Sequence, residues 1–144
     1  MSSYDVLIVE DEPLVAADLA ETLEKLGYRI SAVVDSGVDA IRRAEKWRPS
    51  LVLMDIGLKG EIDGVIAAAY IHDKLNIPIV YLTGNADEEV VERVKVTNPY
   101  GFLLKPFKEI ELKMAIEIAI YKHYTIAAKT DERQKQMGKN GHHN

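Results

Sequence analysis

Short apolar runs alternate along the chain with segments of helical periodicity. The runs are almost continuously apolar, as strands buried on both faces of a parallel sheet are. The run from Tyr4 to Val9 is interrupted only by Asp5. The expected strands cover residues 4–9, 29–34, 51–54, 79–82 and 101–104.

Apolar residues between these runs recur at the spacing of one helical face, with charged residues on the other side. The first helix begins at Pro13, and Gly27 is the stop signal that ends it. Ser36 and Asp63 are residues that can cap the second and third helices. The expected helices cover residues 13–26, 36–47, 64–75 and 87–98, and a last helix runs from about residue 109 to residue 124 or beyond.

A strand and a helix that alternate five times predict an α/β fold with helices on both faces of a parallel sheet. The 144 residues are enough for one domain with a core of its own. The tail from about Lys129 to Asn144 is polar, so we expect a domain over 1–124, followed over 125–144 by a helix extension and a flexible tail.

Composition excludes several classes of protein. The net charge of -5 argues against a general nucleic-acid surface, so no direct nucleic-acid binding is expected from this chain. The absence of cysteine rules out disulfides and thiolate metal sites. No apolar run approaches the roughly 20 residues that a membrane helix needs, and the start is unlike a signal peptide. We expect a cytoplasmic protein with no membrane partner.

Polar residues follow the apolar runs at the point where each run ends. Glu10 and Asp11 follow the first run, Asp55 the third, Thr83 the fourth and Lys105 the fifth. Ligands bind at the carboxyl ends of the strands in open parallel sheets. Each residue alone is common as a cap, a strand residue or a solvated charge. Together they predict a site for a divalent metal and a phosphoryl group.

The residue types suggest how such a site would work. Asp55 is the candidate nucleophile, because a carboxylate can attack phosphorus and hold the group as an acyl phosphate. The three clustered carboxylates would repel one another, and an Mg²⁺ ion resolves that conflict. Lys105 supplies a mobile cation, and Thr83 supplies a hydroxyl donor. Gly84 leaves its backbone N–H open to a phosphoryl group.

These residues and their neighbours resemble the receiver domain of two-component response regulators over about residues 4–124. The resemblance implies a flavodoxin-like, doubly wound (βα)5 fold with strand order 2-1-3-4-5. The motifs that carry it are Val9-Glu10-Asp11, Leu53-Met54-Asp55, Leu82-Thr83-Gly84 and Lys105-Pro106-Phe107.

The resemblance also implies roles. Asp55 would accept the phosphoryl group from a sensor histidine kinase or a phosphotransfer protein. Side chains of Glu10, Asp11 and Asp55 would hold Mg²⁺ or Mn²⁺, with the backbone carbonyl of Gly57, and Lys105 would pair with the phosphoryl group. The protein would be a signalling switch that catalyses only its own phosphorylation and dephosphorylation. Glu10 stands where aspartate is also frequent, and the loop after Asp55 lacks the usual proline and is one residue longer.

Thr83 and Phe102 would form the switch pair, and the Lys105–Pro106 bond would be cis. Phosphorylation would change the surface of the fourth helix, fifth strand and fifth helix, through which a homodimer is possible. Phe102 is expected next to the last helix. That helix has more apolar residues than one buried stripe needs, which fits either a partner surface or deep packing.

Two other classes of protein are consistent with parts of the pattern. An aspartyl phosphohydrolase commonly has a second aspartate two residues after the nucleophile, where this chain has Gly57. A flavin-binding module needs a hydroxyl- and glycine-rich loop after the first strand, where Glu10 and Asp11 would repel a phosphate. The sequence does not name the kinase or the output, nor whether the chain is a stand-alone receiver or a fragment.

Overall fold

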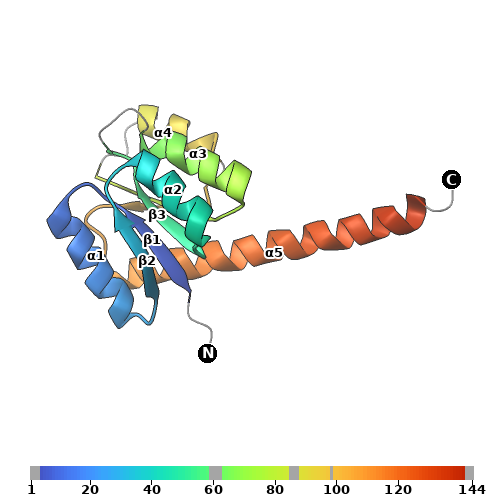
Figure 1. Cartoon of the computed structure of the whole chain (residues 1–144), viewed down its shortest axis with the longest axis horizontal. Coiled ribbons are helices and arrows are strands. Elements are labelled where there is room, and N and C mark those ends of the chain that lie inside the picture. The colour runs from blue at the N-terminus through green and yellow to red at the C-terminus, as the bar shows by residue number, and fades with distance from the viewer. Residues whose placement is uncertain (1–3, 59–62, 85–87, 98, 142–144) are drawn as a thin grey trace.

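A computed structural model of the chain describes residues 4–58, 63–84, 88–97 and 99–141; in the last helix, side chains are described up to residue 129 and at 133. A five-stranded parallel sheet forms the centre of the domain, with strand order β2-β1-β3-β4-β5 (Figure 1). The predicted flavodoxin-like topology is confirmed. The strands are β1 (Asp5–Val9), β2 (Arg29–Val34), β3 (Leu51–Asp55), β4 (Ile79–Thr83) and β5 (Gly101–Leu104).

Helices cover both faces of this sheet. Those of one face, α1 and α5, enclose one apolar core with the strands, and α2, α3 and α4 enclose the other. The helices are α1 (Pro13–Lys25), α2 (Gly37–Trp47), α3 (Gly64–Leu75), α4 (Glu88–Lys95) and α5 (Glu109–Gly141). The predicted start of the fourth helix at Asp87 lies outside the described residues.

The central strands are buried on both sides, which explains their continuous apolar sequence. Leu7 and Val9 of β1 pack into the core under α2 and α3, while Val6 and Ile8 pack into the core under α1 and α5. All four side chains are inaccessible to solvent. Because successive residues of a strand point to opposite faces, a polar residue within such a strand would fall in one of the two cores. The polar residues are therefore confined to the strand ends.

Local signals set the helix boundaries. The Ser36 hydroxyl accepts a hydrogen bond from the backbone N–H of Asp39 at 3.2 Å, which caps α2. The Asp63 carboxylate does the same for α3, accepting from the backbone N–H of Ile66 at 3.0 Å. Gly27 follows α1 with a φ of 96°, a conformation that favours glycine. Both predicted caps and this stop signal are confirmed.

The strand register places the predicted polar residues along one edge of the sheet. Val9 pairs with Met54, so Glu10 and Asp55 follow at the same level. Thr83 pairs with Leu104, so Lys105 comes next to it. The chain reverses its winding direction between β1 and β3, and ligands of open α/β sheets bind at such a switch point. The fold thus gathers these groups in one crevice.

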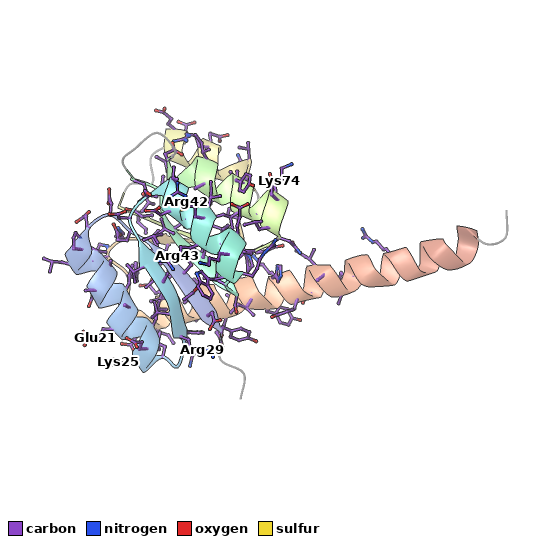
Figure 2. The ribbon with its side chains drawn as sticks, viewed as in Figure 1. Glu21, Lys25, Arg29, Arg42, Arg43 and Lys74 are labelled. Atoms are coloured by element: carbon purple, nitrogen blue, oxygen red, sulfur yellow. The ribbon has the colours of Figure 1, made fainter. Side chains whose placement is uncertain are left out.

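Charged side chains occupy the outer surfaces of the helices and the β2 edge, as Figure 2 shows for Arg42 and Arg43 on α2. Two exposed ion pairs lie elsewhere on the domain: Lys25 is 3.7 Å from Glu109, and Arg29 is 2.7 Å from Asp5. Exposed pairs of this kind contribute roughly 0–1 kcal/mol. The apolar cores, rather than these pairs, stabilise the fold.

Helix α5 is much longer than the domain requires. It leaves the sheet and projects from the domain to Gly141, so it includes much of the segment predicted to be a flexible tail (Figure 1). The domain boundary at 124 stays a prediction. Within the described part of the chain, no helix combines the length and the apolar character needed to cross a membrane.

Candidate functional site

Three carboxylates meet at the carboxyl ends of β1 and β3. Oxygen atoms of Glu10, Asp11 and Asp55 all lie within 4.8 Å of one another. Glu10 is only 2% exposed and Asp55 only 6%, whereas Asp11 is partly exposed. Because all three groups offer oxygen ligands and repel each other when ionised, the cluster has the chemistry of a site for a hard divalent cation.

Lys105 reaches this cluster from the end of β5. Its ammonium Nζ lies 2.7 Å from Glu10 Oε1 and 3.9 Å from Asp55 Oδ1. Two backbone N–H groups also donate to the carboxylates, that of Glu12 to Glu10 at 3.2 Å and that of Gly57 to Asp55 at 3.0 Å. One ammonium faces three carboxylates, so the cluster has an excess of negative charge when all are ionised.

The two buried carboxylates have opposite pKa shifts. Burial raises the pKa of Asp55 to about 6, and the neighbouring Glu10 carboxylate adds to the increase. Burial acts in the same direction on Glu10, but hydrogen bonds involving Lys105 and Asp55 outweigh it and lower the pKa of Glu10. Glu10 is therefore the buried member that stays ionised most readily, and Lys105 is its counterion.

An open cavity of about 430 Å³ lies directly over Asp55. The side chains of Asp55, Lys105 and Thr83 line this cavity, and Thr83 is only 5% exposed. The exposed residues Gly57 and Gly84 line it as well. Asp11 and Glu12 complete the lining. The cavity thus unites the predicted nucleophile, cation, hydroxyl and backbone groups. That the Gly57 carbonyl serves as a metal ligand stays a prediction, and the loop residues 59–62 lie outside the described residues.

Gly64 is a site residue whose importance the sequence did not reveal. It begins α3, and a Cβ atom placed on it would overlap the backbone carbonyl oxygen of Asp55. The helix can therefore approach the Asp55 backbone only with glycine at this position. The cap residue before it, Asp63, also accepts a 2.6 Å hydrogen bond from Arg93 of α4. In sequence, Gly64 reads only as the first residue of a capped helix.

Phe102 lies on the α4 side of the sheet, so its predicted position next to α5 is wrong. It is half-buried and borders an apolar cavity of about 270 Å³ with Val91 and Val94 of α4. Leu103, the next residue, packs into the core under α5 instead. The alternation of side chains along a strand explains the error, because only every second residue of β5 can face α5. Thr83, two residues after Tyr81, points to the same face as Phe102.

The peptide bond between Lys105 and Pro106 is cis. It directly follows the residue whose ammonium reaches the carboxylate cluster. Lys105 also donates its backbone N–H to the carbonyl of Thr83 at 2.7 Å, so its backbone is bonded to the end of β4.

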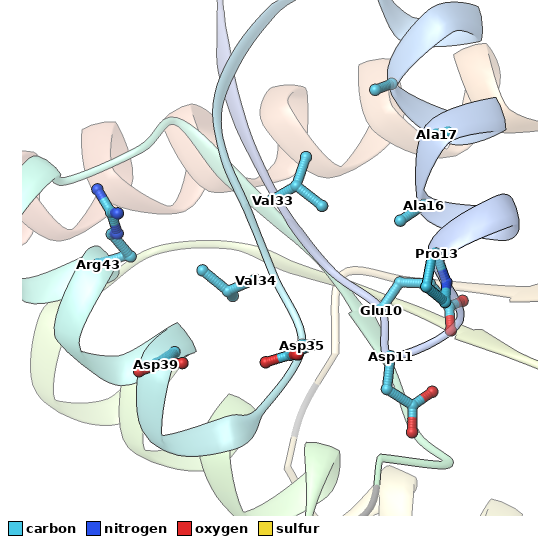
Figure 3. Close-up of a pocket in the computed structure, with 11 residues that line it drawn as sticks. Glu10, Asp11, Pro13, Ala16, Ala17, Val33, Val34, Asp35, Asp39 and Arg43 are labelled. Carbon is cyan, nitrogen blue, oxygen red and sulfur yellow. The ribbon is translucent and has the colours of Figure 1, made fainter.

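A second pocket of about 610 Å³ opens beside the cluster, between α1, α2 and the end of β2 (Figure 3). Asp11 belongs to both cavities. In Figure 3, Asp35 lies at the end of β2 near Asp11, and Arg43 of α2 lies across the pocket from Ala16 of α1. This pocket could not be predicted from the residue pattern, because its walls come from several elements whose relative positions only the structure shows.

Comparisons with known proteins agree with this geometry. The family model described as response regulator receiver domain matches residues 6–117. The transcriptional regulatory protein PdtaR of Mycobacterium tuberculosis is 40% identical over 123 residues, which cover 85% of this chain and 60% of that protein. The chain thus spans about 60% of the length of this curated relative.

Solved structures give the same result. The signal receiver domain of a modulated diguanylate cyclase from Desulfovibrio desulfuricans G20 matches with a TM-score of 0.82 and 43% identity, over 86% of this chain and 98% of that chain. The receiver domain of the sensor histidine kinase PA1611 from Pseudomonas aeruginosa, described with a magnesium ion coordinated in its active site cleft, matches with a TM-score of 0.74 and 33% identity, over 83% of this chain and 98% of that chain. The chain therefore belongs to the response regulator receiver domain family, the signalling switches of two-component systems.

Proposed function

We propose that Asp55 accepts a phosphoryl group from a phosphohistidine of a sensor kinase or phosphotransfer protein. The observation that carries the proposal is the position of the Asp55 carboxylate under an open cavity of about 430 Å³, with Lys105 Nζ 3.9 Å away. An Asp55 oxygen forms a bond to phosphorus while the phosphorus–nitrogen bond to histidine breaks. The histidine keeps the electron pair and takes up a proton, and Asp55 becomes an acyl phosphate.

The carboxylate cluster fits Mg²⁺ or Mn²⁺. Its donors are oxygen atoms within 4.8 Å of one another, and they carry more negative charge than Lys105 neutralises. Asp11 and Asp55 would bind the ion directly, with the Gly57 carbonyl as a further ligand. Glu10 already accepts hydrogen bonds from Lys105 and from the backbone of Glu12, so its contribution would be smaller. When bound, the ion would supply positive charge that stabilises the phosphoryl oxygens.

Lys105 would change partner during the reaction. Its ammonium is held by Glu10 at 2.7 Å, and the flexible lysine stem lets it reach an anion in the cavity above Asp55. The backbone N–H of Gly84 and the hydroxyl of Thr83 would donate to the same phosphoryl group. The domain would thus promote both the formation and the hydrolysis of its own acyl phosphate.

The signal would leave the site through Thr83 and Phe102. Both side chains face the α4 side of the sheet, and the apolar cavity next to Phe102 gives the ring space to change position. The surface of α4, β5 and α5 is therefore the proposed output surface. Leu104, which is 49% exposed, is an apolar residue available to a partner there. The homodimer through this face stays a prediction, which sedimentation with and without beryllofluoride would test.

Intact mass spectrometry tests the acceptor. The protein is incubated with acetyl phosphate and Mg²⁺, and the wild type is expected to gain the mass of one phosphoryl group. Asp55→Asn should gain none, because the amide is a far weaker nucleophile. Asp35→Asn is the matched control, since Asp35 directly follows β2 of the same sheet but lies outside the cavity over Asp55. Equal labelling of Asp55→Asn and wild type would contradict the proposal, as would undiminished labelling in EDTA.

A further inference from the structure

The surface of α5 that points away from the sheet carries its own apolar stripe. The opposite side of the helix is fixed by Leu112 and Ile116, which are fully buried in the core. The outward stripe, called the α5 seam below, alternates spacings of four and three residues, which is the heptad repeat of a coiled coil. The α5 seam consists of Met114, Ile118, Tyr121, Thr125 and Ala128.

The three large apolar members of the α5 seam are exposed to an unusual degree for their type. Met114 is 55% exposed, Ile118 45% and Tyr121 72%. The outer half of α5 also stands apart from the described remainder of the chain, as Figure 1 shows. A single helix in water is marginally stable, and most helices in proteins depend on packing of an apolar face. The α5 seam therefore has the properties of a surface that another helix covers.

We propose that a second copy of this chain covers the α5 seam, forming a parallel two-stranded coiled coil. This inference does not depend on the phosphorylation of Asp55. The α5 seam lies on the α5 part of the proposed output surface, but Phe102 and Leu104 of β5 do not belong to it.

Charge complementarity supports a second copy and its orientation. In a parallel coiled coil with this register, Glu117 of one helix faces Lys122 of the other, and the twofold symmetry produces this pair twice. In an antiparallel arrangement, Lys122 would face the equivalent flank of the second helix, which carries lysine or alanine. The Tyr28 hydroxyl donates a 2.9 Å hydrogen bond to the Glu117 carboxylate, which keeps this side chain beside the α5 seam. A carboxylate can accept several hydrogen bonds, so Glu117 can also bind Lys122 of the second copy.

The shape of the surface supports the same arrangement. A hollow of about 600 Å³ lies beside the outer part of the α5 seam, and Tyr4, which precedes β1, also lines it. The small seam residues Thr125 and Ala128 line it together with the larger side chains of Tyr4, Tyr121 and Tyr124. In a coiled coil, each side chain at the interface inserts into a space between side chains of the facing helix, and small residues next to large ones leave such a space. The stretch from Met114 to Ala128 covers about 21 Å of helix.

Sedimentation of a matched pair of variants tests the α5 seam. Ile118 and Ile126 lie on the same helix and are 45% and 47% exposed, but only Ile118 belongs to the α5 seam. The wild type should show a concentration-dependent dimer without any phosphoryl analogue. Ile118→Glu should remove it, and Ile126→Glu should not. A wild type that is monomeric at every concentration, or equal effects of the two variants, would overturn the proposal. Thermal melts check folding, and Thr125→Glu replaces Ile118→Glu if the latter melts early.

Cysteine cross-linking tests the parallel register. The chain has no cysteine of its own, so an introduced cysteine can pair only with its copy in the second chain. Parallel helices place Ala128 next to the same residue of the second copy. Mild oxidation should therefore join Ala128→Cys into a dimer but leave Ile126→Cys mostly unlinked. Glu117→Lys and Lys122→Glu should each weaken the dimer at least tenfold, and the double variant should restore it. A dimer without the Ala128→Cys cross-link, or without this rescue, would refute the parallel arrangement.

Discussion

Lys105 Nζ lies 2.7 Å from Glu10 Oε1, although the two residues are 95 positions apart in the sequence. Glu10 is buried and Lys105 partly buried, so the pair links the ends of β1 and β5 across the carboxylate cluster. The pair also keeps an ammonium 3.9 Å from Asp55, which is where a phosphoryl group would form. Lys105 therefore has a structural contact as well as a proposed role in phosphoryl transfer.

Lys105→Gln should affect stability and phosphorylation together. Removing the ammonium leaves the Glu10 carboxylate buried without its counterion, and a hydrogen bond to a charged group contributes about 1.5–3 kcal/mol. We expect a loss of that order in the free energy of unfolding, measured by urea denaturation, and slower labelling by acetyl phosphate. Lys113→Gln, which changes an exposed lysine of α5, is the control. If both variants lose the same stability, the buried pair has no special role.

Gly64→Ala should displace Asp55. The added methyl group would overlap the Asp55 carbonyl oxygen, so either β3 or the start of α3 must move. Overpacking of this kind costs about 1–3 kcal/mol, and we expect a lower thermal midpoint together with reduced labelling. Gly84→Ala is the comparison for stability, because a Cβ atom there meets nothing within 4 Å. Equal midpoints for the two variants would show that the contact between Gly64 and Asp55 is not tight.

Hydrogen exchange should detect the proposed route from Thr83 to α4. Beryllofluoride with Mg²⁺ should change the exchange of Glu88–Lys95 and leave that of Gly37–Trp47 nearly constant. The reason is that Phe102 borders a cavity with Val91 and Val94. Thr83→Ala should reduce the change in α4, since the hydroxyl would no longer bond to the phosphoryl analogue. An equal change in both helices, or one that Thr83→Ala leaves intact, would argue against this route.

Much of the site could be predicted because strand ends share one edge of a parallel sheet. The positions of Glu10, Asp55 and Lys105 followed from that rule. The approach of Gly64 to the Asp55 backbone could not be predicted, since it depends on how closely α3 packs. The pairing of Lys105 with Glu10 also required the structure, because a flexible side chain had several anions within reach. Strand alternation puts Phe102 and Leu103 on opposite faces, but the face that each takes required the structure, because the bounds of this strand were predicted correctly and do not say which side α5 covers.

Acid should destabilise the domain partly through His123. Burial, with a smaller effect from nearby His72, lowers the pKa of His123, and its ring contacts Tyr100 at 6.1 Å between centroids. The folded state therefore favours the neutral ring. The associated stability is present above the unfolded pKa of about 6.5 and is lost as the pH falls through that value toward the folded pKa.

Thermal midpoints at pH 7.5 and pH 5.5 measure this effect. His123→Gln should show a smaller decrease between the two pH values than the wild type, because it removes a group that binds its proton more weakly when folded. An identical decrease in both proteins would mean that other groups account for the acid sensitivity.

The identity of the phosphorylated residue tests the central claim most directly. The protein is labelled with acetyl phosphate and Mg²⁺, treated with borohydride, which reduces an acyl phosphate to an alcohol, and digested for peptide mass spectrometry. Asp55 should be converted to homoserine, and omission of Mg²⁺ should abolish the conversion. Reduction at Glu10 or Asp11 instead, or a label carried by histidine, would contradict the account.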